Sequence, residues 1–593
     1  MNYQAPLKEL NFVLNQLAEL PSVCSLPGYE DCSVELVEAI LEEGAKFAEQ
    51  ELAPINRQGD QGARWQDGAV TAAPGFKAAW QRYVESGWVG LRAPAEFGGQ
   101  GLPALVALAA EEMWCSANLA FSLAPMLTLG ALEAIAHHAS DELKQRYLPR
   151  MAAGEWTGTM NLTEPQAGSD LAQVRTRAER QADGSYRISG QKIFITWGEH
   201  DMADNIVHLV LARLPDAPAG VKGISLFIVP KLLVNADGSL GARNDVRCVS
   251  IEHKLGIHGS PTAVMSFGDQ EGATGFLVGE ENKGLAYMFT MMNHARLGVG
   301  VEGLAVSERA YQAAVSYARE RVQSRAVGSP DAAGVPIIRH PDIRRMLMTM
   351  RAQIEAQRAL ACVAAAALDR AGHHPQPEER AKNQALLDFL IPIVKGWCTE
   401  QANEITSMAI QVHGGMGYIE ETGVAQYYRD ARITAIYEGT TGIQALDLVG
   451  RKTAGDKGAV AQALLEEVLL TVRELDGAGL SDLARALRKA AADASRAIGF
   501  VLEHFAAEPQ WPAAGSVPFL KLMGIVLGGW QMGRAALIAE RLRHEEGADV
   551  SFLANKLMTA RFYGAHLLPQ TGALVHAIVE GAESVLALPE DQF

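Results

Sequence analysis

The amino-acid sequence predicts an α+β multidomain fold. It comprises an N-terminal α-helical domain, a middle antiparallel β domain, a C-terminal helical bundle and an additional C-terminal helical domain. A chain of 593 residues is too long for a single hydrophobic core. Its composition, 48% apolar and 20% charged, is that of globular domains. The hydrophobic period changes from helical to alternating near residue 157 and becomes helical again after residue 282.

The first helical region follows a lead segment, residues 1–34. Residues 34–52 (VELVEAILEEGAKFAEQEL) place acidic side chains on one helix face and Val, Ile, Leu and Phe on the other, and Pro54 follows. Residues 76–86 and 104–150 continue the helical pattern. We therefore predict the N-terminal helical domain over residues 35–156.

Short alternating runs bounded by Asp-Gly, Gly-Gln and Pro-Lys turns predict the middle β domain over residues 157–278. The predicted strands are 184–190, 192–196, 206–212 and 223–229. Long helical patterns then predict the bundle over residues 279–452, with helices at 284–325, 341–372, 378–415 and 422–449. A linker near residue 453 leads to the additional helical domain, residues 453–593.

Charge, cysteine usage and hydropathy exclude several classes of protein. The net charge of −17, without a basic run, argues against nucleic-acid binding. The six cysteines are scattered without CxxC pairs, which argues against a disulfide framework or a zinc site. No signal peptide is indicated. The apolar stretch 517–533 contains Lys521 and several glycines, so we interpret it as a buried helix rather than a membrane span. We expect a cytoplasmic protein without a metal site.

Two motifs resemble known sites but lack the required context. Gly298, Gly300 and Gly303 fit the GxGxxG pattern, yet they lie inside a helical apolar stretch with no surrounding βαβ unit, which argues against a dinucleotide site. The adjacent histidine pairs at 137–138 and 373–374 lack a partner at i+4, so we interpret them as solvated side chains rather than metal ligands.

One carboxylate is a candidate general base. Glu438 lies between Tyr437 and Gly439, and the apolar Ile433 and Ile436 precede it. Burial among such neighbours raises the pKa of a carboxyl towards the working range, and a glycine beside it lets a substrate carbonyl approach the backbone. On these residues alone, a surface glutamate at a helix end is an equally open interpretation.

Three motifs together resemble the acyl-CoA dehydrogenase family. Residues 162–170 (LTEPQAGSD) are similar to its first signature, and residues 411–418 (QVHGGMGY) are similar to the core of its second. Residues 436–440 (IYEGT) are similar to its catalytic segment. The motifs follow the family's order and approximate spacing, and the resemblance covers about 35–450. The chain's length is similar to that of a long bacterial branch containing fatty acyl-CoA and 3-methylmercaptopropionyl-CoA dehydrogenases.

The resemblance implies α,β-dehydrogenation of an acyl-CoA, with FAD as the hydride acceptor. It implies that Glu438 is the catalytic base and that its backbone N–H helps to activate the thioester carbonyl, with Gly439 leaving room for the thioester. Some relatives carry the base on an earlier helix, but the matching position here is Ala295. Asn293, Arg296 and Ser169 match substrate-contacting positions, although an internal ion pair is an open alternative for Asn293 and Arg296.

The resemblance also implies a set of FAD contacts. An aromatic-x-Thr pattern beside the flavin is matched by Phe194 and Thr196, where the family commonly has Trp in place of Phe. Arg321 matches a pyrophosphate-binding arginine, whose planar fork suits phosphate oxygens. The segment that reaches FAD from a neighbouring subunit is matched by Gln411, Gly414 and Gly415. The remaining expected FAD contacts are Met160, Leu162, Thr163, Gly168, Ser169, Gln323 and Thr440.

The sequence departs from the family pattern in several places. Ser324 and Arg325 replace a usual Phe-Gly, and residues 326–336 (AVGSPDAAGVP) have the appearance of an insertion, so the FAD contacts there are open. Gly442 stands where short members have Gln, and Gln426 stands where the second signature has a basic residue. None of these departures removes a catalytic group.

The leading hypothesis is dehydrogenation of a fatty acyl-CoA, medium to long chain favoured, in the first step of β-oxidation. Electron-transfer flavoprotein is the expected acceptor. The alternatives are a 3-methylmercaptopropionyl-CoA dehydrogenase, an acyl-CoA oxidase that uses O₂, and a non-catalytic helical scaffold. A homodimer or dimer of dimers is expected, because the family completes each FAD site with a second chain. Membrane contact is expected to be at most peripheral, through residues 458–590.

Overall fold

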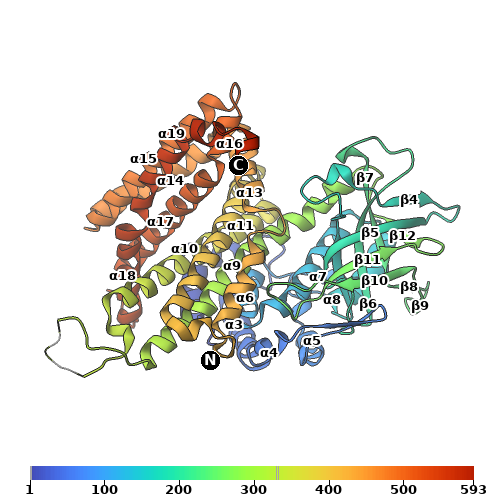
Figure 1. Ribbon diagram of the computed structural model, residues 1–593, viewed down its shortest axis with the longest axis horizontal. Coiled ribbons are helices and arrows are strands. Elements are labelled where there is room, and N and C mark those ends of the chain that lie inside the picture. The colour runs from blue at the N-terminus through green and yellow to red at the C-terminus, as the bar shows by residue number, and fades with distance from the viewer. Residues whose placement is uncertain (1–2, 329, 331–332) are drawn as a thin grey trace. The chain divides into compact units, whose positions relative to one another are not determined.

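The computed structural model describes residues 3–328, 330 and 333–593 (Figure 1). Positions 329, 331 and 332 of the expected 326–336 insertion, and residues 1–2 of the lead segment, lie outside the described residues. The chain forms two compact units. The first comprises Met1–Glu42, Ala104–Ser116 and Val299–Phe593, and the second comprises Glu43–Pro103 and Ala117–Gly298.

The first unit is helical. Its core is a bundle of long helices. The prediction of a single helix over 422–449 is wrong, because two helices separated by a turn at residues 435–440 occupy that region. The bundle helices are α6 (Ala104–Ala117), the later part of α9 (Gly284–Glu320), α10 (Pro341–His373), α11 (Pro377–His413), α12 (Val424–Thr434) and α13 (Thr441–Asp447).

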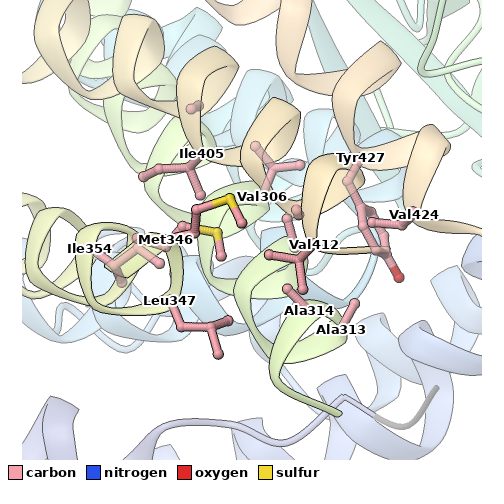
Figure 2. Close-up of a cluster of buried hydrophobic side chains, with 14 of the residues drawn as sticks. Val306, Ala313, Ala314, Met346, Leu347, Ile354, Ile405, Val412, Val424 and Tyr427 are labelled. Atoms are coloured by element: carbon pink, nitrogen blue, oxygen red, sulfur yellow. The ribbon is translucent and has the colours of Figure 1, made fainter. Parts of the chain in front are cut away.

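A cluster of buried apolar side chains holds α9, α10, α11 and α12 together (Figure 2). Ala313 and Ala314 of α9 let the neighbouring helices approach closely, and Met346 and Leu347 of α10 fill the space between them. Tyr427 brings α12 into the same cluster. The helix that leads into the turn at 435–440 is therefore held in a packed core.

The additional C-terminal helices pack directly on this bundle. A Cβ placed on Gly524 of α17 (Ser516–Leu542) would lie 2.3 Å from Cγ of the buried Trp397 on α11, so only glycine permits this approach. Lys556 of α18 (Val550–His566) donates to Glu355 of α10 at 2.7 Å and to Glu9 of the lead segment at 2.6 Å. The other helices here are α14 (Ala459–Gly477), α15 (Ser481–His504), α16 (Gln510–Ala514), α19 (Thr571–Glu580) and α20 (Ala582–Leu586).

Among the residues that the structure describes, two helices are long and apolar enough to cross a membrane by length and composition, α7 (Leu119–His138) and α17. Their most apolar windows are 83% and 78% buried inside the structure. Core helices pass the same test, and the burial of α17 agrees with the interpretation of 517–533 as a buried helix.

The second unit combines helices with a mixed sheet. The strand order is β10-β11-β5-β12-β7-β6-β3, and β4 pairs with β5 and β6. All neighbours along this order are antiparallel except β3 and β6, which run parallel. The sheet strands are β3 (Trp156–Asn161), β4 (Arg177–Arg180), β5 (Tyr186–Thr196), β6 (Asn205–Arg213), β7 (Ile224–Pro230), β10 (Val246–Ile251), β11 (Thr262–Phe267) and β12 (Ala273–Leu277).

The predicted turn at Gly190-Gln191 is wrong, because β5 runs unbroken from Tyr186 to Thr196. Gly190 has φ +149°, and a Cβ there would lie 2.6 Å from Thr176 Oγ1. The glycine therefore serves a close approach within the sheet rather than a chain reversal. The alternation of helical and β regions, and hence the predicted fold class, is confirmed. The helices outside the sheet are α4 (Ala53–Gly59), α5 (Phe76–Glu85), α7 and α8 (Asp141–Ala152).

Candidate active site

The predicted site residues divide between the two units. The first part of α9, which carries Asn293 and Arg296, belongs to the second unit together with the β strands. The base candidate Glu438 and the residues from Arg321 onwards belong to the first unit. Each set has its own local geometry.

In the second unit, a β-bulge orients the predicted aromatic residue. Ala263 of β11 pairs with Ile195 and Met265 pairs with Lys192, so Ile193 and Phe194 together oppose a single residue. Phe194 has φ +60° and its side chain is 59% exposed, an unusual state for a large aromatic. Bulges commonly turn a side chain out of a sheet beside an active site. The bulge therefore leaves the Phe194 side chain exposed at the surface of this unit.

The residues after β3 lie beside this bulge. The backbone N–H of Ile193 donates to the carbonyl of Thr163 at 2.9 Å, and Nζ of the buried Lys192 donates to the carbonyl of Leu162 at 2.9 Å. Thr163 and Thr196 are half-buried. An exposed aromatic side chain on a strand that is bonded to the Leu162–Thr163 segment suits one face of a planar cofactor such as a flavin. The structure thus brings Leu162, Thr163, Phe194 and Thr196 together.

A buried ion pair supports the same segment, and sequence reasoning missed it. Lys192 Nζ lies 2.8 Å from Glu164 Oε1, and both side chains are almost fully buried. Glu164 also accepts from the backbone N–H groups of Arg175 and Thr176. Burial raises the pKa of Glu164, but the Lys192 charge and these hydrogen bonds outweigh it and hold that pKa at about 2. A lysine inside the strand run 192–196 was the available signal.

The remaining predicted residues of this unit lie on β3, in the loop after it and on α9. Met160 is half-buried on β3, and Gly168 and Ser169 are exposed in the loop that follows. Arg296 is 7% exposed, Ala295 is 2% exposed and Asn293 is half-buried on α9. Between them in sequence, His294 is engaged elsewhere, with its Nδ1 2.8 Å from Arg92 Nη1 and 3.5 Å from Glu133 Oε2.

In the first unit, Glu438 lies in the turn between α12 and α13, where its backbone is left-handed. Glu438 has φ +55° and Gly439 has φ +92°. A non-glycine residue in this region costs on the order of 1 kcal/mol or more, and such positions cluster at functional sites. The side chain of Glu438 is neither fully buried nor fully exposed. Surrounding side chains must therefore hold the turn in place.

Two buried side chains hold the carbonyl groups of the turn. Lys395 Nζ, from α11, donates to the Gly439 carbonyl at 2.7 Å. Gln444 Nε2, from α13, donates to the carbonyls of Glu438 at 3.2 Å and Gly439 at 3.3 Å. A Cβ on Gly439 would lie 2.7 Å from that same Nε2 atom. The glycine is thus required locally by its positive φ and by Gln444.

A buried carboxyl contacts the turn from α9. The Tyr437 hydroxyl donates a hydrogen bond to Glu302 Oε2, and Glu302 is fully buried. Burial raises the pKa of Glu302 to about 8, and the nearby charge of Glu438 adds to this effect. Burial also raises the pKa of Tyr437 well above its usual range, with the Glu302 charge contributing in the same direction. Sequence reasoning missed Glu302, Lys395 and Gln444, although single charged residues within apolar runs marked the first two.

The other predicted residues of this unit lie at helix ends. Arg321 follows the last residue of α9, and the backbone N–H of Gln323 donates to the carbonyl of Val335 at 3.1 Å. Thr440 is the N-cap of α13, accepting from the N–H of Ile443. Gln411, Gly414 and Gly415 are exposed at the end of α11, where Gly414 has φ +60°.

The GxGxxG pattern has a packing explanation. Gly300 and Gly303 lie within α9, where a Cβ on Gly300 would lie 2.5 Å from Val394 Cγ1 and one on Gly303 would lie 3.0 Å from the Cys398 carbonyl oxygen. The glycines allow α9 and α11 to approach closely. Within the described ranges, no group of three or more His, Cys, Asp or Glu side chains could hold a metal ion.

Comparisons with known proteins agree on one family along nearly the whole chain. The models named "Acyl-CoA dehydrogenase, N-terminal domain", "middle domain" and "C-terminal domain" match residues 35–155, 159–270 and 282–453. A further model, "Acetyl-CoA dehydrogenase C-terminal like", matches residues 462–589.

Two relatives and one solved structure illustrate the similarity. The chain is 50% identical over 591 residues, 99% of each chain, to a 3-methylmercaptopropionyl-CoA dehydrogenase from Ruegeria pomeroyi. It is 34% identical to a butyryl-CoA dehydrogenase from Syntrophomonas wolfei, over 100% of this chain and 99% of the relative. In fold it is similar to an acyl-CoA dehydrogenase complexed with FAD from Bacillus anthracis, with a TM-score of 0.74, 23% identity, and coverage of 95% of this chain and 92% of the other.

Proposed function

Since the chain belongs to the acyl-CoA dehydrogenase family, and is therefore an FAD-dependent oxidoreductase, we propose that its substrate is 3-methylmercaptopropionyl-CoA. The observation that carries this proposal is 50% identity, over 99% of both chains, to a protein of that name. The relative named for butyryl-CoA is also a short-chain enzyme by name. Both names favour a short acyl group over the medium to long chain expected from the sequence, which we retain as the second candidate.

We assign the proton transfer to Glu438. The reaction removes a proton from the α-carbon and a hydride from the β-carbon, which leaves a trans double bond between them. The Glu438 carboxylate would accept the α-proton, and its backbone N–H would stabilise negative charge on the thioester oxygen. When bound, FAD supplies the acceptor for the hydride. Arg296 and Asn293 on α9, with Ser169, are our candidates for contacting the substrate.

We assign FAD binding to both sets of residues. Phe194 and Thr196 would contact the flavin, together with Leu162 and Thr163, because the bulge in β5 exposes this surface. Arg321 would bind a phosphate oxygen. The remaining assignments, which rest on the resemblance alone, are Met160, Gly168, Ser169, Gln323, Gln411, Gly414, Gly415 and Thr440.

Substitution of Glu438 by Gln tests the base. The Gln side chain keeps the shape of the site but accepts no proton, so Glu438→Gln should bind FAD and remain yellow while acyl-CoA no longer bleaches the flavin. Anaerobic stopped-flow spectroscopy at the flavin absorbance band measures the rate. If bleaching continues at nearly the rate of the unaltered protein, a different residue is the base.

A pair of matched thioesters tests the substrate. Pentanoyl-CoA has the same chain length as 3-methylmercaptopropionyl-CoA, with a methylene in place of sulfur. The rate of flavin reduction should be highest for the sulfur compound, and it should fall from pentanoyl-CoA to palmitoyl-CoA. Replacing one group of this size, here sulfur by a methylene, should change the rate of flavin reduction by about 10–200-fold. A maximum at octanoyl-CoA or longer would favour the fatty acyl candidate, and with it a place in β-oxidation.

We further propose that electrons pass to electron-transfer flavoprotein. A ferrocenium acceptor under anaerobic conditions should support turnover, whereas air should yield little peroxide. Abundant peroxide would instead identify an acyl-CoA oxidase.

We also propose that the chain is a cytoplasmic homodimer or dimer of dimers. Exposed apolar side chains at the end of α11 support this: Tyr418 is 86% exposed, and Met416 and Ile419 are about half exposed. Light scattering on the yellow protein should give at least twice the chain mass. Flotation with liposomes should leave it in the soluble fraction, because membrane contact is proposed to be peripheral at most.

A further inference from the structure

Glu302 is a fully buried carboxyl group without a partner of opposite charge bonded to it in the described part of the chain. Its Oε2 atom accepts the hydrogen bond from Tyr437, and its Oε1 atom has no hydrogen-bond partner among the described residues. Burying an unpaired carboxylate is costly, so such a group either neutralises by binding a proton or serves a function. Neither the family resemblance nor the comparisons assign it a role.

The close approach of α9 and α11 fixes where this carboxyl lies. Gly300 and Gly303 flank Glu302, and each permits contact with α11 that a Cβ would block, at Val394 and Cys398 respectively. Lys395, between those two α11 residues, donates to the Gly439 carbonyl. Two neighbouring helices therefore each supply one buried polar side chain to the same turn, Glu302 to its beginning and Lys395 to its end.

The groups that face Glu302 come from three elements besides its own. Tyr437 and Glu438 belong to the turn, Lys395 belongs to α11 and Glu111 belongs to α6. The two acidic neighbours disfavour a charge on Glu302, while Lys395 and the Tyr437 hydroxyl favour it. Glu302 and Glu438 are thus separated in sequence but interact electrostatically.

We propose that Glu302 is a positioning residue for the base. Through its bond to Tyr437 it fixes the left-handed turn that carries Glu438, and it forms with Glu438 an interacting pair of carboxyl groups. This inference rests on the proposed role of Glu438. Tyr437 immediately precedes Glu438, so displacement of the tyrosine ring moves the base, and a misplacement of about 1 Å costs on the order of 100-fold in rate.

The pair has a consequence for pH dependence. Because burial and the Glu438 charge raise the pKa of Glu302 to about 8, its carboxyl is mostly protonated at neutral pH and ionises near pH 8. That ionisation adds a negative charge beside the base, so the proton affinities of the two groups are linked. The rate of flavin reduction by the unaltered holoenzyme should therefore show an ionisation near pH 8.

Two substitutions at this position separate charge from hydrogen bonding. Glu302→Gln keeps the acceptor for Tyr437 and removes the charge, so reduction at pH 7 should stay within about 10-fold of normal while the ionisation near pH 8 disappears. Glu302→Leu also removes the acceptor, so reduction should fall by about 10–100-fold at all pH values. The Gln variant has nearly the shape of Glu and controls for general disruption of the core.

Tyr437→Phe removes the other partner of the same hydrogen bond. It should lower the rate as Glu302→Leu does, and the double variant should be no slower than the slower single variant, because both delete one interaction. The positioning role would be refuted if the losses of rate multiplied in the double variant, or if neither single variant lost rate. An unchanged ionisation near pH 8 in Glu302→Gln would refute the pairing.

Thermal unfolding provides a readout independent of activity. The pKa of Glu302 is higher in the folded chain than its ordinary value of 4.5. The stabilisation it provides is therefore complete below about pH 4.5 and is lost as the pH rises through about 8. As the pH rises across this range, the melting temperature of Glu302→Gln should increase relative to that of the unaltered protein, and a constant difference would contradict a raised pKa of Glu302 in the folded chain. Failure of the assignment of Glu438 as the base would appear separately, as full bleaching by Glu438→Gln, and failure of the proposed function would appear as no bleaching of the unaltered protein by any acyl-CoA.

Discussion

Gly439 offers a sharp test of how the turn that carries Glu438 is built, because a matched glycine, Gly442, lies three residues away. Gly439 has φ +92°, and a Cβ there would lie 2.7 Å from Gln444 Nε2. Gly442 has no such constraint, since the nearest atom to its Cβ position is Thr440 Oγ1 at 3.8 Å. Gly439→Ala and Gly442→Ala therefore add the same methyl group to two positions of one segment under different constraints.

The cost of Gly439→Ala follows from two contributions. Alanine in the left-handed region costs about 1–2 kcal/mol. Gln444 must also move from its hydrogen bonds to the carbonyls of Glu438 and Gly439. Gln444 is fully buried, and leaving such groups unpaired costs about 1–3 kcal/mol. The total free-energy cost of the substitution is roughly 2–5 kcal/mol, so we expect the turn to rearrange and Glu438 to move.

Anaerobic flavin bleaching measures the effect of the substitution on the reaction rate, and thermal unfolding measures its effect on stability. Gly439→Ala should reduce the bleaching rate by about 100-fold or more and lower the melting temperature by several degrees. Gly442→Ala should remain within a few fold of normal. The reasoning is refuted if both variants bleach at similar rates, or if Gly439→Ala melts and reacts like the unaltered protein.

Two further predictions concern stability. Glu164→Gln should lower the melting temperature at pH 7, because it leaves the buried Lys192 unpaired, at a cost of about 3–5 kcal/mol. Since the folded chain holds the pKa of Glu164 at about 2, below its ordinary 4.5, its stabilising effect is present above pH 4.5 and is lost as the pH falls towards 2. Over that range, the difference in melting temperature between Glu164→Gln and the unaltered protein, measured by calorimetry, should become smaller. Substitution of the exposed Glu179 by Gln should cause no such difference. Gly524→Ala should lower the melting temperature by an amount equivalent to about 1–3 kcal/mol, because its Cβ would lie 2.3 Å from Trp397; an unchanged melting temperature would mean that α17 is not held tightly against α11.

The sequence was sufficient to predict which regions are helical and which are β, because long apolar periods determine both. It was insufficient where tertiary contacts override local pattern. Ile433, Ile436 and Tyr437 continue the helical spacing, so the sequence predicted one helix over 422–449. The structure breaks it at Glu438, because Gln444, Lys395 and Glu302 together stabilise a left-handed turn that no local propensity favours.

The β domain shows the same limit. Gly190-Gln191 has the composition of a turn, yet β5 continues through it, since Gly190 is needed for its approach to Thr176. The resemblance identified Phe194, but the bulge that exposes its ring depends on the register between β5 and β11, which a single strand does not encode.

The glycines of the GxGxxG pattern explain how buried charged residues come to support the turn at Glu438. As a nucleotide-binding motif the pattern fails, because it lies inside α9. Yet two of its glycines allow α9 to approach α11, and the residues beside those contacts are Glu302 and Lys395, each a single charged side chain in an otherwise apolar run. Burying either one is unfavourable unless it is hydrogen-bonded. Both are bonded to the turn at Glu438, one through Tyr437 and the other through Gly439. In this chain, the charged residues at the glycine contacts between α9 and α11 therefore support the turn that carries the proposed base, Glu438.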